Sequence, residues 1–200
     1  MQTGSAKTER RRSERKDDTR RRIMAAAGVL FRRHGIDGVG VDAIMREAGL
    51  THGGFYVHFP SKEALAAAVC AASLTRGARL WADSAADAGG GEAALRRIVD
   101  AYLSPERVAG RETGCVLPTL GADLARRPEA HAALAPAIDE MAGTLAACRP
   151  GADRERGMAD LSCMVGAVLL ARLAGDPALA EQILRAARSR VLGAAPGAAG

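Results

Sequence analysis

Residues 42–59, DAIMREAGLTHGGFYVHF, decide the fold of this chain. Their first part has the pattern of a short helix that Gly49 closes, and the segment from Leu50 to Phe59 predicts a second short helix that Pro60 ends. Two short helices joined by a tight, glycine-containing turn form a helix-turn-helix. We therefore expect such a unit in the N-terminal part of the chain.

Helical segments flank this stretch on both sides. From Asp17 to His34 the apolar residues recur at helical spacing, and Gly35 suits the end of that helix. Ser61 is a good N-cap for a long, alanine-rich helix that runs to Asp87. The helix-turn-helix therefore belongs to a three-helix unit, which a long helix joins to the rest of the chain.

The remainder of the 200 residues also predicts helices. Hydrophobic residues make up 48% of the chain but aromatic residues only 3%, and abundant alanine favours close-packed helices over sheets. We expect an all-α fold with about nine helices. The predicted parts are a disordered basic arm (1–16), a helix-turn-helix domain (17–62), a second helical domain (63–193) and a frayed tail (194–200).

The net charge of +5 lies entirely within residues 1–22, which carry nine basic and four acidic side chains. A basic arm ahead of a neutral body suits contact with phosphates, and a solvated tail without a partner is the alternative. The longest apolar runs are too short to span a bilayer, and no apolar segment of a secretory signal follows the basic residues. We expect a cytoplasmic protein with no membrane partner, whose four scattered cysteines stay reduced.

Several motifs in residues 17–65 occur together in one known family. The opening stretch, a first helix that ends LFRRHG (30–35), the turn GVGV (38–41) and SKEAL (61–65) resemble the DNA-binding domain of the TetR family of transcriptional regulators. The resemblance implies an all-helical homodimer whose three N-terminal helices bind an operator in double-stranded DNA. It also implies that the domain over 63–193 dimerises and holds a small-molecule effector.

The second short helix of the unit carries the chemistry for DNA binding. A recognition helix presents its N-terminal residues to base edges, while neighbouring polar groups fix the DNA backbone. Gly53 and Gly54 cost helix propensity, which makes sense if the protein backbone approaches DNA closely. The resemblance implies base contacts from Thr51, His52 and Gly53 and phosphate contacts from Tyr56, His58 and Lys62. The predicted DNA-binding set is Thr51, His52, Gly53, Gly54, Tyr56, His58 and Lys62.

No motif in the sequence indicates catalysis, a cofactor or a metal. There is no Gly-x-Ser-x-Gly and no paired-carboxylate arrangement, and His52 and His58 lie six residues apart, whereas ligands on a helix prefer a spacing of three or four. We therefore expect a protein that is not an enzyme. A small helical enzyme or carrier with a vestigial DNA-binding domain is a less favoured alternative, because the motif over 53–59 is intact.

The segment 102–120 resembles one branch of the same family, in which a Gly-Cys pair opens a helix beside the pocket. In some members of that branch the cysteine senses electrophiles or oxidants. Two roles stay open for this cysteine: a thiol activated by a helix N-terminus, and a small buried apolar residue. The predicted effector-pocket or sensor residues are Cys115, Tyr102, Leu117 and Met141.

The last two predicted helices have wide apolar faces and no later element to cover them. Dimerisation through 156–192 is expected, and an ordinary intramolecular core is the competing account. The predicted interface residues are Met164, Val168, Leu179, Ile183 and Ala187. The favoured function is a repressor that binds a palindromic operator as a homodimer and is released by a small-molecule effector. A thiol-based sensor acting through Cys115 is the alternative.

Overall fold

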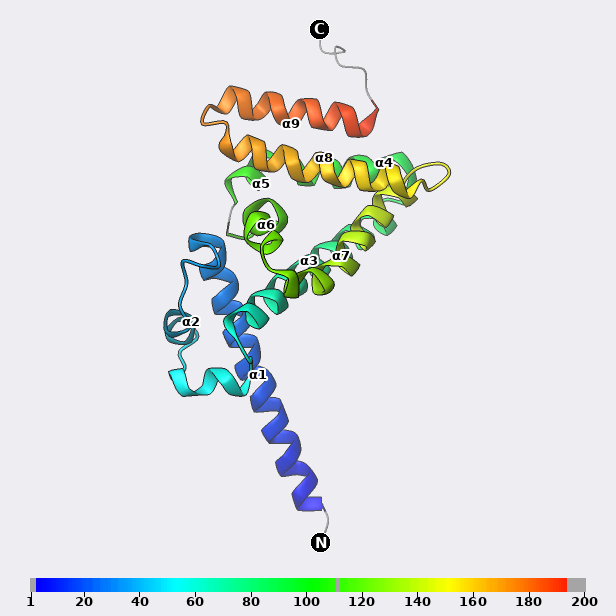
Figure 1. Ribbon diagram of the computed structural model, residues 1–200. Coiled ribbons are helices and arrows are strands. Elements are labelled where there is room, and N and C mark those ends of the chain that lie inside the picture. Colours follow the sequence, from blue (N-terminus) through cyan, green and yellow to red (C-terminus); the bar gives the residue numbers. More distant parts are fainter. Residues whose placement is uncertain (1–2, 111, 194–200) are drawn as a thin grey trace.

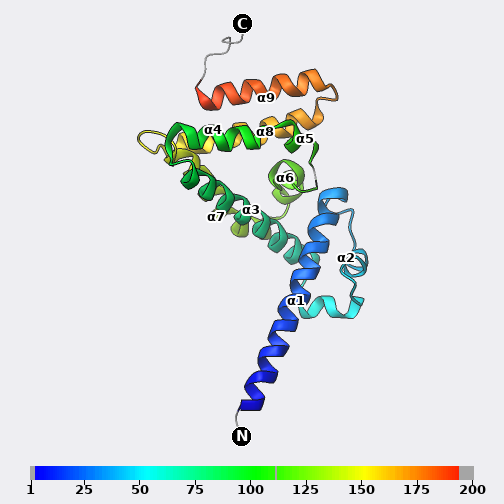
Figure 2. The ribbon, with the colours of Figure 1, turned by 180° about the vertical axis from the view of Figure 1, so that it is seen from behind.

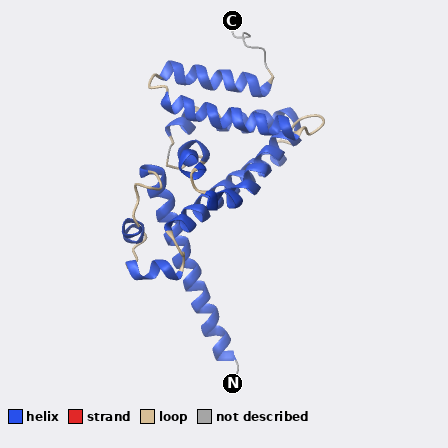
Figure 3. Ribbon diagram, in the orientation of Figure 1, coloured by secondary structure: helices blue, strands red, loops and turns tan. Residues whose placement is uncertain are grey.

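The computed structural model describes residues 3–110 and 112–193, and these residues form helices and no strand (Figure 3). The predicted all-α class is confirmed. The predicted tail over 194–200 and Arg111 lie outside the described residues. The elements are α1 (Thr3–His34), α2 (Val41–Glu47), the 3-10 helix η1 (His52–Val57), α3 (Lys62–Asp87), α4 (Gly91–Tyr102), α5 (Pro105–Ala109), α6 (Leu117–Ala125), α7 (Pro128–Ala147), α8 (Arg154–Leu173) and α9 (Pro177–Leu192).

The helices form two units at opposite ends of the molecule (Figures 1 and 2). The unit of α1, α2 and η1 lies at one end, and the paired helices α8 and α9 lie at the other. Helix α3 runs diagonally between them and packs most extensively against α7. No helix in the described part of the chain is long and apolar enough to cross a membrane.

Local signals in the sequence correctly place the helix ends nearest the helix-turn-helix. The Ser61 side chain accepts a hydrogen bond of 3.1 Å from the amide of Ala64, as expected of an N-cap. Gly35 ends α1 with a φ of 73°, a left-handed conformation that glycine adopts without steric cost. Gly35 therefore sets the end of α1, and Ser61 sets the start of α3.

Helix α1 is longer than the sequence predicts. We expected residues 1–16 to be disordered, whereas the helix begins at Thr3. Its N-terminal part is rich in Arg, Lys and Glu, which are good helix formers, and an ion pair of 3.2 Å links Arg10 and Glu14 one turn apart. Figure 1 shows this part projecting away from the body. Ala6 is the one hydrophobic residue in 3–16, so the sequence has no apolar face there that a search for periodicity would detect.

Two other predicted helices differ in detail. The segment expected as a short α-helix over 50–59 forms the 3-10 helix η1, which is common in short pieces where glycine weakens α-helix formation. Helix α6 begins at Leu117 with Val116 as its N-cap, so Cys115 precedes the helix instead of lying in its first turn.

Candidate DNA interface and ligand cavity

The 3-10 helix η1 presents one buried and one exposed side. Phe55 is fully buried and forms a cluster with Phe59 at a ring-centroid distance of 6.0 Å, which anchors the segment to the core. Tyr56 and Val57 are 63% and 65% exposed. Together with three further exposed residues they form what we call the reading face: Thr51, His52, Gly53, Tyr56 and Val57.

Val57 is a member of this face that sequence reasoning missed. Among aromatic neighbours, a valine resembles a core residue, and only the turn of the 3-10 helix places it outside. An exposed apolar side chain on a reading face suits contact with a thymine methyl group. The exposure of Val57 therefore adds an apolar element to a set that was predicted as polar groups and glycines.

The two glycines of η1 are not required by packing within the chain. A Cβ atom added at Gly53 would meet nothing within 4 Å, and one at Gly54 would meet only the end of Met45, at 3.7 Å. Neither residue has a left-handed backbone. Packing within the chain therefore does not require glycine at these two positions, and the lack of side chains leaves the backbone of η1 accessible from outside.

Arginines of α1 hold the reading segment in place. Arg20 donates a hydrogen bond of 2.9 Å to the carbonyl of His58, and its guanidinium lies 4.1 Å from the ring centre of Phe59. Arg22 donates a hydrogen bond of 2.7 Å to the carbonyl of Ala48 at the end of α2. Charged donors on α1 therefore fix both ends of the segment that joins α2 to α3.

Lys62 has an internal role that the sequence did not indicate. Its ammonium donates to the carbonyls of Ile36 and Val39, at 3.1 and 3.2 Å, in the loop between α1 and α2. An ammonium has three N–H donors, so two are used within the chain. Lys62 is thus a positioning residue for the loop between α1 and α2, in addition to its predicted contact with a DNA phosphate.

The two histidines of the predicted set have different surroundings. The ring of His52 pairs with Asp42 at the start of α2 and remains exposed. His58 is half-buried, and its Nδ1 has no hydrogen-bond partner among the described residues. Burial, followed by the charges of Lys16 and Arg20, lowers the pKa of His58 below its usual range, which favours the neutral ring at neutral pH.

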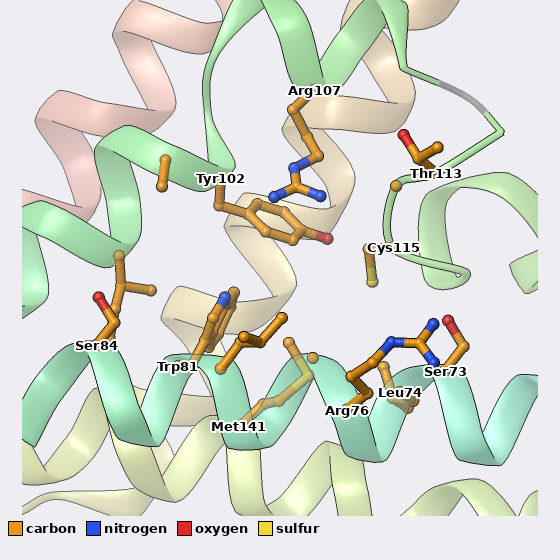
Figure 4. A pocket seen from close by; sticks show the side chains of 15 residues that line it. Ser73, Leu74, Arg76, Trp81, Ser84, Tyr102, Arg107, Thr113, Cys115 and Met141 are labelled. Carbon is orange, nitrogen blue, oxygen red and sulfur yellow. The ribbon is translucent and has the colours of Figure 1, made fainter.

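A cavity of about 220 Å³ lies in the helical domain that follows η1, between α3, α4 and the segment that leads into α6 (Figure 4). Tyr102, Cys115 and Met141 line it, and Leu117 does not. Three of the four predicted pocket residues thus surround one space, whereas Leu117 packs against the core.

The cavity also has residues that the sequence did not single out. Arg76 and Trp81 reach it from α3, and Arg107 reaches it from α5. The rings of Trp81 and Tyr102 meet edge to face, with centroids 5.3 Å apart. Trp81 is the single tryptophan of the chain, and it follows Arg76 by five residues along the same helix.

Cys115 is the cysteine that lines the cavity. The other three lie elsewhere, and burial raises their pKa values, to about 11 for the Cys70 thiol. A raised pKa leaves the thiol protonated and unreactive at neutral pH. Inert packing is therefore favoured for Cys70, Cys148 and Cys163.

Side-chain contacts tie the N-terminal unit to α6 and its preceding loop. The Asp123 carboxylate accepts a hydrogen bond of 3.0 Å from the amide of Ile36, and the Arg127 guanidinium pairs with Asp37. Arg33 of α1 forms two hydrogen bonds, of 2.8 and 2.9 Å, with Glu112, two residues before Gly114 in the cavity wall. The loop after α1 is thus connected to the segment that carries Cys115.

The structure changes the predicted set on α8 and α9. Met164, Val168 and Ala187 are buried inside the chain, where α8 packs against α7 and α9, so they cannot face a partner. Leu179 remains 44% exposed, and Ile183 is half-buried. Apolar periodicity found a buried face correctly but could not tell which neighbour buries it.

A second apolar stripe lies on the outer side of α8, and its α8 members were not in the predicted interface set. Its spacing of seven, eleven and fifteen residues from Met158 places its members on one side of the helix. Leu173 is 72% exposed and Leu169 43%. We call this set, with two residues of α9, the outer stripe: Met158, Val165, Leu169, Leu173, Leu179 and Ile183.

The geometry defines an all-helical protein with an N-terminal helix-turn-helix and a cavity-bearing helical domain. Residues 23–69 match the model of a known family, the bacterial regulatory proteins of the tetR family. The chain therefore carries the helix-turn-helix DNA-binding domain of the TetR family, and it has the fold of TetR-family transcription regulators. A comparison with curated protein sequences gives no significant match.

Solved structures with this fold cover nearly the whole chain. The reduced form of NemR from Escherichia coli is 20% identical with a TM-score of 0.74, covering 91% of this chain and 100% of that chain. A TetR-family regulator from Agrobacterium tumefaciens is 20% identical with a TM-score of 0.72, covering 88% and 98%. A TetR regulator from Chloroflexus aurantiacus is 24% identical with a TM-score of 0.72, covering 90% and 95%.

Proposed function

We propose that this protein is a cytoplasmic transcriptional repressor, which binds a palindromic operator as a homodimer and is released when a small-molecule effector occupies the cavity. The observation that carries the DNA-binding part is the exposed reading face. Its backbone at Gly53 is uncovered, while Arg20 and Arg22 hold its ends in position. Close approach to base edges requires a rigidly held segment whose backbone is not covered by side chains.

A gel shift with fragments of the source genome tests this proposal. In excess nonspecific competitor DNA, the repressor retards a small subset of fragments, whereas a helical enzyme or carrier with a vestigial domain retards none. The same preparation with Tyr56→Ala serves as the matched control, because that side chain is exposed and its loss leaves the core intact. Equal retardation of all fragments would contradict sequence-specific binding.

The helical N-terminal extension supports DNA binding by charge. Residues 1–16 carry a net of four positive charges per chain, and α1 projects past the reading face on the same side of the molecule (Figure 1). Arginines on such a projection are suited to contact phosphates beyond the base-reading segment. We propose that the extension adds affinity without sequence preference.

Replacing Arg10, Arg11 and Arg12 by Gln tests the role of the extension. We expect an unchanged melting temperature, because these side chains are exposed, with weaker DNA binding. The plot of log affinity against log salt should become shallower by about 0.9 for each phosphate that the variant no longer neutralises. Titrations of operator and unrelated DNA at several salt concentrations measure both effects. Unchanged affinity at low salt would make the extension a solvated helix without a partner.

We propose that the segment of Thr113 to Cys115, which lines the cavity and leads into α6, transmits ligand binding to the α1–α2 loop through the contacts of α6 with that loop. Asp123 holds the amide of Ile36 from one side, and Lys62 holds its carbonyl from the other. A movement of α6 would therefore move the loop that precedes α2. Coupling of this kind between two sites is typically worth about 1–3 kcal/mol.

The variant Asp123→Ala tests this connection. Losing the carboxylate leaves the Ile36 amide without its acceptor, so deuterium exchange over 35–39 should become faster, and operator affinity should change by roughly 5-fold or more. Asp139→Ala is the matched control, because that carboxylate pairs with Arg154 at a distance from the loop. Unchanged exchange over 35–39 would show that Asp123 does not hold the loop.

A thiol-based sensor acting through Cys115 is the second candidate. Its support is the position of the thiol in the cavity wall, and one structure with the same fold is that of NemR in its reduced form. Iodoacetamide should then release operator DNA from the wild-type protein and not from Cys115→Ser. The variant Cys163→Ser, which removes a half-buried thiol elsewhere, should respond as the wild type does. Release from Cys115→Ser as well would exclude this candidate.

A further inference from the structure

The charged residues that line the cavity are all basic. Two guanidinium groups line it, those of Arg76 from α3 and Arg107 from α5, and no described lining residue is acidic. Among residues 3–110 and 112–193, neither guanidinium forms an ion pair or a hydrogen bond. The contact of Arg107 is with the ring of Tyr102, at 5.9 Å from the ring centre. Two arginines without a carboxylate at one cavity are suited to bind an anion.

The Tyr102 hydroxyl adds a donor to the same wall. The residue is 2% exposed, and its hydroxyl makes no hydrogen bond of normal geometry among the described residues, although the Cys115 thiol lies close enough to contribute to its pKa shift. Figure 4 shows the hydroxyl pointing into the space between Arg107 and Cys115. Burial is the main reason that the pKa of Tyr102 is raised well above its usual range, so the group stays protonated as a donor. A buried hydroxyl without a hydrogen bond of normal geometry marks a position that a ligand atom can satisfy.

Another part of the cavity wall is apolar. Leu80 and Trp81 come from α3, Ile98 comes from α4, and Met141 comes from α7. The rings of Trp81 and Tyr102 meet edge to face in this wall, and aromatic side chains of this kind are suited to pack against another ring. The cavity volume of about 220 Å³ suits a ligand with a single ring and a short side chain.

We propose that this cavity binds a small amphipathic anion, an aromatic ring bearing a carboxylate or a phosphate, whose acidic group is held by Arg76, Arg107 and the Tyr102 hydroxyl. The ring lies against Trp81 and its apolar neighbours. The inference deepens the proposed function, because it rests on this cavity being the effector site. Carboxylate and phosphate share the chemistry that arginine and a hydroxyl donor recognise, so both are included in the test.

Trp81 provides a direct readout, because it is the only tryptophan of the chain and lines the cavity. The full-length protein is titrated, without DNA, with benzoate, phenylacetate, 3-phenylpropionate and phenyl phosphate, and with the amides of the three carboxylic acids. Tryptophan emission and calorimetry measure binding. We expect at least one of the anions to bind and to change the emission, and the amide of any binding carboxylate to bind at least 10-fold more weakly.

Four variants locate the anion. Arg76→Gln and Arg107→Gln should each weaken binding of the anion at least 10-fold, and Tyr102→Phe, which keeps the ring, should weaken it less. Arg76→Lys keeps the charge and should retain binding better than Arg76→Gln. This variant keeps the role of the charge testable if Arg76→Gln is poorly folded. The matched control is Arg79→Gln, because Arg79 is exposed on the same helix and does not line the cavity.

The inference is wrong if none of the anions binds, if the amides bind as tightly as the acids, or if the Arg76 and Arg107 variants bind as the control does. A gel shift with operator DNA separates this result from the proposed function. Anion binding without release of DNA would uphold the ligand class and contradict the effector-responsive repressor. DNA binding that responds only to neutral compounds would uphold the repressor and contradict the ligand class.

Discussion

The variant Leu173→Glu should be a monomer that no longer binds its operator. Leu173 is the most exposed residue of the outer stripe, and Leu169 lies one turn before it on the same side of α8. In a two-fold dimer through α8 and α9, both copies of the new carboxylate would be buried, at a cost of several kcal/mol each. Without the second half-site, the gain from two linked binding events disappears, about 100-fold or more in affinity.

Sedimentation and operator titration measure the two effects together. Ile183→Glu, on α9, should behave in the same way although this residue is half-buried. The control is Ala82→Glu, which adds the same charge to an exposed site on α3. A folded Leu173→Glu protein that sediments as a dimer would remove the outer stripe from the interface, and α7 would be the next helix to test.

A second large effect is expected at Gly53. The variants Gly53→Ala and Gly53→Leu should fold normally, because the space around the position is empty within the chain. Each should gain slightly in stability, by about 0.5–1 kcal/mol for Ala, since glycine is a poor helix former. If the backbone of η1 approaches DNA, the leucine side chain should cost roughly 100-fold in operator affinity, or ~2.7 kcal/mol.

Thermal unfolding and operator titration of the same samples separate fold from function. Gly121→Ala on α6 is the control, because a Cβ there also meets no neighbour and the site is far along the chain from the reading face. Operator binding by Gly53→Leu at wild-type affinity would mean that this part of η1 stays away from the DNA.

The local signals of the sequence predicted the fold well, and the long-range ones did not. Ser61 and Gly35 act on their immediate neighbours, so their capping roles could be read from the chain alone. The helical state of residues 3–16 could not, because a solvated charged helix has no apolar face. Met164 and Val168 were assigned to an interface because an apolar pattern does not specify which helix will cover it.

The candidate sites show the same division. The set around Thr51 and Gly53 forms one exposed surface as expected, since these residues are neighbours in sequence. The internal bond of Lys62 to Ile36 and the placement of Arg76 and Arg107 in the wall of one cavity depend on how distant segments pack. An arginine in a helix ordinarily belongs to the solvated surface, and Arg76 is itself exposed, so only the fold reveals that these two also line a cavity.

The central claim is that a two-fold dimer reads DNA through η1, and selection of DNA by the purified protein tests it most directly. Random duplexes that the protein retains through several rounds are sequenced, and the number of chains bound per duplex is measured by sedimentation. We expect an inverted repeat whose half-sites match each other, occupied by two chains or an even number of them. Enrichment of no sequence, or of a single half-site bound by one chain, would contradict it.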